Sequence, residues 1–344
     1  MRTAVSAADT KRMIDKLLDK GYQQQAGVVL RSIAAQINGG VMKARFAQLQ
    51  AEMQRLTDTG GKLQADNPVL RAFLADYATA VEKSAKAIDG AAPGLQQSAI
   101  DAAEKIVPKV TLPGFSDAQI SAIWNQPDPE AVAKLIGFTD SPAWKQRLVQ
   151  YSADTVQAIQ DAAIRGIVGG KSPLAVGRDV STLAQDIPLY QAQSMMRTLQ
   201  MTSYRTANQA YGVANGDILS GQIRIAVLDP RTCLSCVALH GTELAIGERV
   251  DDHDQGRCTS VFVVRVRDVN VHRGQDWFEN QSDETQSDMM GTAAYSAYKA
   301  GDVTLKDFIH PYQDAVFGQM IREASLTGIL GADAQKYIQG ARRA

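Results

Sequence analysis

The chain has 344 residues, enough for one large or two modest domains, because single hydrophobic cores usually stop growing at about 250–300 residues. Its 45% hydrophobic and 21% charged residues are typical of soluble globular proteins. The formal net charge of -1 excludes a global basic field that would attract nucleic acid, so any contact with DNA would have to be local and weak. The low aromatic content of 6%, with abundant Ala and Gln, favours packed helices over a β-sandwich.

The amino terminus predicts neither secretion nor membrane insertion. Its first 20 residues are polar and charged, and they lack the apolar core that a secretory signal needs. Nowhere in the sequence does an uncharged apolar run approach the roughly 20 residues that span a bilayer. We therefore expect a soluble protein that acts where thiols stay reduced.

Residues 1–110 predict a helical N-terminal domain. Apolar residues at helical spacing predict helices over residues 8–56 (interrupted at Gly39 and Gly40), 68–88 and 96–107. Segment 108–115 contains two prolines and a glycine, which predicts a linker. We place a domain boundary there.

Residues 111–220 predict a helical middle region. Ser116 and Gln119 have the spacing of a capping box, and Ser141 and Ser172 each place a capping hydroxyl before a proline suited to the first helical turn. The expected helices are a short one after Ser116, a long one from Pro142 closed by Gly169 and Gly170, one from Pro173 to about Gln185, and one from Pro188 towards Tyr211.

Residues 221–344 predict a small α+β module. Segment 222–228 alternates like a strand, and segment 259–266 is strongly β-branched. Helices return after Gly274 and end in an amphipathic helix over about 312–326. The predicted fold class is therefore mainly α, with a helical N-terminal region and a C-terminal module that contains a short β-sheet and a Cys/His-rich connection.

The three cysteines of the chain all lie in or beside that connection, at Cys233, Cys236 and Cys258. Cys-x2-Cys is the spacing at which two thiolates can hold one tetrahedral zinc ion from a tight turn. Cys258 offers a third ligand and His253 is the natural fourth, while His240 competes for that place. A metal would also explain why so long a connection stays ordered. The sequence therefore predicts a Zn²⁺ site formed by Cys233, Cys236, His253 and Cys258.

Three other interpretations of the window stay open at this point. The thiols could simply be buried, since free cysteine is among the most buried residue types. Cys233 and Cys236 could form a redox pair, although such a pair usually opens a helix in a thioredoxin-like unit and the sequence predicts none here. His253 could lie on the surface, because acidic residues flank it on both sides.

A catalytic zinc ion is not predicted. Nucleobase deaminases place a His-x-Glu before a Pro-Cys-x2-Cys, whereas here the histidines follow the cysteine pair and His240 has the wrong spacing to Glu243. The sequence contains no Walker loop, nucleophile elbow or dinucleotide fingerprint. Glu243 and Asp251 are acidic candidates near the cysteines, but such carboxylates are mostly solvated turn residues. We assign no catalytic and no cofactor-binding residues.

Four segments carry similarity to a known family, at residues 197–218, 228–241, 253–259 and 276–291. The most recognisable are Asp-Pro-Arg-Thr-Cys-Leu-Ser-Cys from Asp229 and His-Asp-Gln-Gly-Arg-Cys-Thr from His253. Together they resemble the phage head-morphogenesis family, the Mu F-like minor capsid proteins, over roughly residues 160–330. The chain departs from the family at Asp254, Gly256 and His240, where the family often has a proline, a cysteine and an acidic residue.

The resemblance implies a low-copy minor head protein. Some relatives carry fused enzymatic domains, but this sequence contains no such segment, and we expect no enzymatic activity. Such proteins associate with the portal protein or the major capsid protein at the inner capsid face, help procapsid assembly and can leave with the DNA. The expected location is the head interior of the virion, and the host cytoplasm during assembly. Beyond weak contact with packaged DNA, neither a membrane nor a small-molecule substrate is expected as a partner.

Within the cysteine window, we expect Asp229 and Arg231 to shape the first turn and Arg257 to anchor the closing loop. The alternative function is a phage-encoded zinc-dependent hydrolase or nucleic-acid-processing enzyme. That function would require an open metal position and an acid such as Glu243 nearby. A DNA-associated ejection protein is a third possibility, which the near-neutral net charge disfavours.

Overall fold

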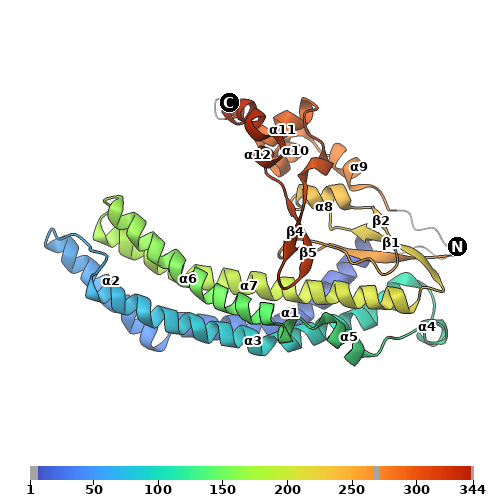
Figure 1. The fold of residues 1–344 in the computed structure, drawn as a ribbon, viewed down its shortest axis with the longest axis horizontal. Helices are drawn as coiled ribbons and strands as arrows, with labels where there is room; N and C mark the ends of the chain where they lie inside the picture. The colour runs from blue at the N-terminus through green and yellow to red at the C-terminus, as the bar shows by residue number, and fades with distance from the viewer. Residues whose placement is uncertain (1–6, 266–270, 342–344) are drawn as a thin grey trace. The chain divides into compact units, whose positions relative to one another are not determined.

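The structure is a computed structural model that describes residues 7–265 and 271–341 (Figure 1). It confirms the predicted fold class: the chain is mainly helical, with a small C-terminal module that contains two short sheets and a Cys/His cluster. Of the helices within these ranges, none is both long and apolar enough to cross a lipid bilayer.

The first part of the chain is entirely helical. Its helices are α1 (Ala7–Asn38), α2 (Gly40–Asp58), α3 (Pro68–Thr111), α4 (Asp117–Ile123), α5 (Pro129–Ile136), α6 (Pro142–Val168) and α7 (Pro173–Ala214), with a 3₁₀ turn η1 at Phe138–Asp140. Two predicted starts are confirmed, since the Ser116 hydroxyl caps α4 in a full capping box and the Ser141 hydroxyl caps α6.

The C-terminal part contains the two sheets and a set of short helices. Its elements are β1 (Leu219–Ile225), α8 (Leu234–Leu239), β2 (Glu243–Leu244), β3 (Thr259–Val264), α9 (Gly274–Glu279), α10 (Asp283–Met290), α11 (Thr292–Lys299), η2 (Leu305–Phe308), β4 (Ile309–Asp314), β5 (Gly318–Glu323), α12 (Leu326–Leu330), η3 (Gly331–Asp333) and α13 (Ala334–Ala341). One antiparallel sheet has the order β2-β1-β3, and β4 and β5 form a separate hairpin. The last residue of the predicted strand 259–266, Val266, lies outside the described residues.

The chain divides into two compact units that do not follow its linear order. Unit 1 comprises Met1–Asp19, Gln96–Ile136 and Gln200–Ala344, and unit 2 comprises Lys20–Leu95 and Gly137–Leu199. This division differs from the sequential segments 1–110, 111–220 and 221–344, because α1, α3 and α7 each contribute residues to both units.

Three helix breaks predicted from glycine and proline do not occur. The predicted linker 108–115 begins inside α3, which is continuous from Pro68 to Thr111. The break expected between residues 88 and 96 is also absent, because α3 runs through Gly94; a Cβ there would lie 2.8 Å from Oε1, at the flexible end of the Gln25 side chain in α1. Similarly, α7 continues through Pro188, where a new helix was expected to start.

Two tyrosines explain how α7 tolerates Pro188 in unit 2. A proline lacks the N–H that would bond to the carbonyl four residues earlier, which here belongs to Ala184. The buried Tyr77 hydroxyl donates to that carbonyl at 3.1 Å, and the Tyr151 hydroxyl donates to the carbonyl of Pro188 at 3.2 Å. Burial raises the pKa of both tyrosines, so the hydroxyls remain donors.

The predicted helix over 312–326 is wrong, since these residues belong largely to the β4–β5 hairpin. The Asp314 carboxylate accepts the N–H groups of Val316 at 2.8 Å and Phe317 at 2.9 Å, and Gly318 adopts a φ of +76°. These features make a tight turn that reverses the chain. Tyr312 then pairs with Met320 across the hairpin.

The β2-β1-β3 sheet packs against the last turns of α7 within unit 1. A Cβ on Gly212 would lie 2.6 Å from the ring of Phe262 in β3, so only glycine permits this close approach. One turn earlier, the Asn208 amide donates to the Ser260 hydroxyl at 2.9 Å. This packing fixes the face of α7 that carries Arg205 against the connection between β2 and β3.

Tyr77→Phe should leave the Ala184 carbonyl buried without that donor, which costs about 1–3 kcal/mol of folding free energy. Pro188→Ala supplies an N–H for the same carbonyl, so Tyr77→Phe should cost less in that background than in the natural chain. Urea unfolding measures both differences, with Tyr190→Phe, at a position 65% exposed, as the control. Equal costs in the two backgrounds would contradict this account of the helix.

Candidate metal centre

Cys233 and Cys236 lie at the start of α8, where a short turn places both side chains on the same face of the helix. The Asp229 carboxylate accepts the N–H of Arg231 at 3.0 Å and the hydroxyl of Thr232 at 3.0 Å. This turn leads to Cys233, the N-cap of α8, and places Cys236 three residues later on the same helix face. The structure therefore agrees with the expected role of Asp229, whereas Arg231 contributes its N–H and an exposed ion pair.

The remaining donors lie in the loop that leads into β3. Gly256 donates its N–H to the His253 carbonyl at 2.9 Å, and Cys258 directly precedes β3. Arg257 pairs with Asp229 at 3.3 Å, which joins this loop to the first turn as expected. A Cβ at Gly256 would lie 2.3 Å from the carboxylate of Asp252, so the cysteine that the family often has at this position would not fit here.

Five side chains converge into one potential ligand cluster. The ligand atoms of Cys233, Cys236 and His253 all lie within 4.8 Å of one another, and so do those of Cys236, Asp252 and Cys258. Cys236 belongs to both groups and connects them. A small cavity of about 50 Å³ opens among these residues, with space for an ion and not for an organic substrate. The cluster could hold a metal ion.

Hydrogen bonds among the thiols shift their pKa values apart. A hydrogen bond with Cys236 is the main factor that lowers the pKa of Cys233, to about 4, against the effect of burial. The same kind of bond lowers the pKa of Cys258, while both bonds and burial raise the pKa of Cys236. Cys233 is thus a thiolate at neutral pH, which is the form that ligates metals.

The ring of His253 is oriented for ligation through Nε2. Its Nδ1 lies 2.7 Å from the Asp254 carbonyl, which suits a proton on Nδ1 and leaves Nε2 directed to the cluster. Burial lowers the pKa of His253, but a hydrogen bond with Cys233 and the charge of Asp252 outweigh it and raise the pKa to about 10. A metal would displace the second proton, since imidazole ligates only when neutral.

His240, the competing ligand in the sequence, lies outside both groups. Its Nδ1 accepts the N–H of Ala226 at 2.8 Å, and burial together with the nearby Arg224 lowers its pKa to about 4. His240 is therefore a neutral histidine that holds the end of β1. The acidic candidates are also elsewhere, with Glu243 exposed in β2 and Asp251 paired with Arg249 at 3.1 Å.

Four residues of the site were not identified from the sequence: Asp252, Arg205, Arg224 and Glu323. Asp252, with no side-chain exposure, contacts Arg205 at 2.6 Å and Arg224 at 3.6 Å. Glu323, at the end of β5, accepts the N–H of Leu234 at 2.6 Å, and burial raises its pKa. The one local signal was the run of acidic residues beside His253, which does not reveal which carboxylate is buried.

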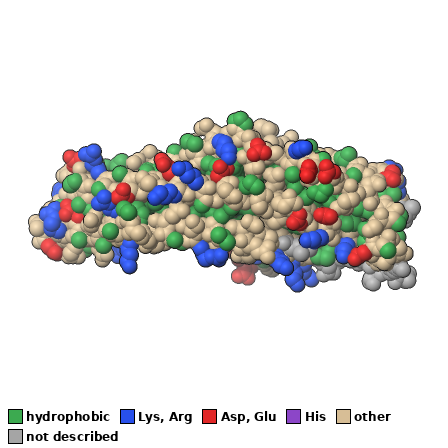
Figure 2. Space-filling model, turned by 90° about the horizontal axis from the view of Figure 1, so that it is seen from below, with side chains coloured by type: hydrophobic (Ala, Val, Ile, Leu, Met, Phe, Trp, Pro, Cys, Tyr) green, Lys and Arg blue, Asp and Glu red, His purple; other side chains and the backbone are tan. Residues whose placement is uncertain are grey.

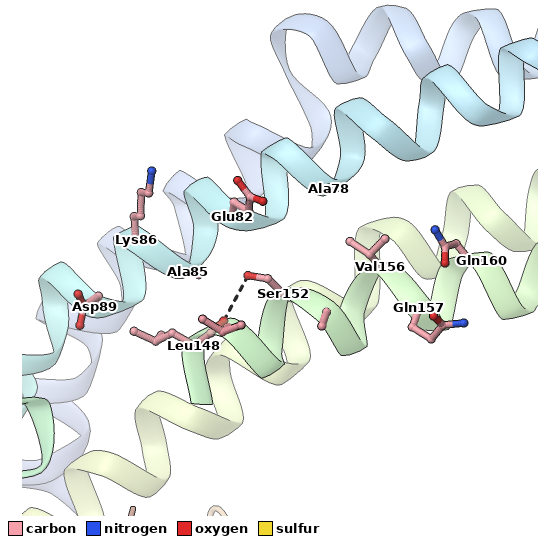
Figure 3. A pocket seen from close by; sticks show the side chains of 12 residues that line it. Ala78, Glu82, Ala85, Lys86, Asp89, Leu148, Ser152, Val156, Gln157 and Gln160 are labelled. Carbon is pink, nitrogen blue, oxygen red and sulfur yellow. Dashed lines mark hydrogen bonds between the residues drawn. The ribbon is translucent and has the colours of Figure 1, made fainter. Parts of the chain in front are cut away.

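Unit 2 contains a larger cavity of about 570 Å³ between α3 and α6, lined by apolar side chains and by Glu82, Lys86, Asp89 and Ser152 (Figure 3). Its lining is mostly apolar. The Ser152 hydroxyl donates to the Leu148 carbonyl at 3.2 Å, which stabilises its own helix and leaves no activated nucleophile. Asp89 is paired with Lys145 at 2.7 Å. The ligand cluster, where five potential metal ligands meet, is the stronger candidate for a functional site.

Comparison of the chain with protein-family models, with curated proteins and with solved structures finds no match. The interpretation of the cluster accordingly depends on its own geometry and on the resemblance of the segments that form it.

Gly256→Ala should destabilise unit 1 by about 2–4 kcal/mol, because the added Cβ overlaps the buried Asp252 carboxylate. Gly216→Ala is the matched control, since its added Cβ would have its nearest neighbour at an ordinary 3.5 Å. Thermal unfolding of the two variants measures the difference. Indistinguishable melting temperatures would show that the loop around Asp252 adapts freely.

Proposed function

We propose that the chain is a phage minor head protein, a structural and assembly component whose C-terminal module is stabilised by a bound metal ion. One observation carries the proposal. The two segments that most resemble the family, 228–241 and 253–259, are also the two that supply Cys233, Cys236, His253 and Cys258 to one buried cluster. If the similarity of these two short segments were due to chance, there would be no reason for their cysteines and histidine to lie together in space.

The ligand set favours a structural over a catalytic metal. Three thiolates and one imidazole, from Cys233, Cys236, Cys258 and His253, would fill all four positions of a tetrahedral zinc ion, whereas catalytic sites keep one position open for water or substrate. The cavity of about 50 Å³ is far smaller than the roughly 300–1,000 Å³ of small-molecule sites. Glu323, an acid near Cys233, already accepts the N–H of Leu234. The zinc-dependent hydrolase is therefore the less favoured function.

The mixed charges on one face of the molecule do not favour tight binding to DNA. Lys and Arg side chains are interspersed with Asp and Glu on the face drawn in Figure 2. Such a surface lacks the continuous basic patch that drives counterion release on DNA binding. We therefore propose the portal protein or the major capsid protein as the main partner inside the virion head, with packaged DNA as a weak contact.

Quantitative mass spectrometry of gradient-purified particles tests this function. We expect the chain in the particles at a low, reproducible copy number near that of the portal protein. Its absence from particles would overturn the proposal. Turnover abolished by a chelator would instead favour the hydrolase.

Cys236→Ser should lower the melting temperature of the chain by roughly 5–10 °C, because it removes the donor that both ligand groups share. The variant should also enter particles several-fold less often. A chelator provides the internal control: it should lower the melting temperature of the natural chain and leave that of the variant unchanged. Unchanged melting and unchanged incorporation in the variant would contradict the structural role of the metal.

A further inference from the structure

The Asp252 carboxylate lies in the middle of the ligand cluster and orients it. Its Oδ2 accepts the N–H of Cys258 at 2.9 Å, and its Oδ1 accepts the N–H of His253 at 3.0 Å. The Cys236 thiol also lies 3.2 Å from Oδ1. Both carboxylate oxygens thus accept hydrogen bonds from potential ligand residues: from the backbone of Cys258 and His253 and from the thiol of Cys236. These bonds suit Asp252 to orient the donors from outside the coordination sphere.

Two buried guanidinium groups face this carboxylate from different elements. Arg205 of α7, 3% exposed, donates to the carbonyls of Cys258 at 2.8 Å and Gly256 at 2.6 Å, as well as to Asp252. Arg224 of β1, also 3% exposed, lies 3.6 Å from Asp252 and 3.9 Å from the Cys236 sulfur. Around Asp252, one carboxylate therefore meets two guanidinium groups, which leaves one positive charge in excess there; Glu323, which lies near Cys233, is not part of this group.

An uncompensated buried charge is costly, so the ligand cluster must supply one negative charge. A divalent ion held by three thiolates and one neutral imidazole has a net charge of minus one. That charge cancels the excess. A monovalent ion with the same ligands would leave one negative charge unbalanced, and a trivalent ion would leave one positive charge.

We propose that Arg205 and Arg224, bridged by Asp252, are positioning residues that neutralise a trithiolate centre and so select a divalent ion of the zinc type. The proposal rests on the metal centre of the proposed function. Arg205 also makes α7 part of the site, since it holds the carbonyl of one ligand residue. Orienting groups of this kind typically contribute about 10- to 100-fold to metal affinity.

A double-mutant cycle separates charge balance from mere structural support. Arg205→Met leaves the zinc-loaded centre with one negative charge in excess, and Asp252→Asn leaves it with one positive charge in excess. The two together restore neutrality. We therefore expect each single variant to bind Zn²⁺ about 10- to 100-fold more weakly than the natural chain, and the double variant to bind more tightly than either.

The measurement is competition for Zn²⁺ between a chromophoric chelator and the full-length chain. Co²⁺ provides a second readout, because thiolate-to-cobalt absorption grows with the number of thiolate ligands. We expect a three-thiolate spectrum in the natural chain and the double variant, and a weaker band in Arg205→Met. Arg265→Met is the matched control, since the Arg265 guanidinium donates to the carbonyls of Gly216 and Asp217, away from the ligand cluster, and its loss should leave affinity and spectrum unchanged.

The outcomes distinguish this inference from the proposed function. Losses that simply add in the double variant, or an Arg205→Met that behaves like Arg265→Met, would overturn the role of charge balance and leave the metal centre intact. A natural chain that binds neither Zn²⁺ nor Co²⁺ would overturn the metal centre, and this inference with it. If Arg205→Met alone fails to fold, the comparison of Asp252→Asn with the double variant still decides, because charge balance requires the double variant to bind more tightly.

Discussion

The buried carboxylate of Asp252 is the constraint on which the C-terminal module depends. Removing a charge from water costs several kcal/mol unless excellent partners surround it. Asp252 obtains them from three separate places: Arg205 on α7, Arg224 on β1 and the N–H groups of its own loop. The loop cannot move away from the helix or the sheet without leaving a charge buried and unpaired. The same contacts bring the cysteines into register, so one carboxylate determines both the packing of the loop and the geometry of the ligands.

The β4–β5 hairpin depends in turn on this loop. A two-stranded hairpin is marginally stable on its own. Here Arg249 donates to the carbonyls of Phe317 at 2.7 Å and Gln319 at 2.6 Å, and the Ile321 N–H lies 3.3 Å from the Asp252 carbonyl. A metal ion would therefore stabilise more than its four ligands, since the loop that it fixes is also the surface to which the hairpin attaches.

The sequence predicted what local chemistry determines and missed what distant contacts determine. Cysteine spacing, His253 and the serine caps of α4 and α6 are local signals, and the structure agrees with each. The ion pair of Arg205 with Asp252 spans 47 residues and leaves no periodic trace in the sequence. The helix start predicted at Pro188 is wrong, because the Tyr77 hydroxyl of another helix donates to the Ala184 carbonyl that the proline leaves without an N–H partner. The β4–β5 hairpin was missed because the spacing of its apolar residues also suits a helix. The turn at Asp314 reverses the chain and so produces a hairpin in place of a helix.

X-ray absorption spectroscopy at the zinc edge of the purified full-length chain would test the metal centre most directly. Zinc–sulfur and zinc–nitrogen bonds differ in length, at about 2.3 Å and about 2.0–2.1 Å, so the spectrum reports the number of each ligand. This account predicts one zinc ion per chain, with three sulfur ligands and one nitrogen ligand and no bound water. A chain without zinc, or a zinc ion coordinated mainly by oxygen and nitrogen with an exchangeable water, would contradict a closed structural site.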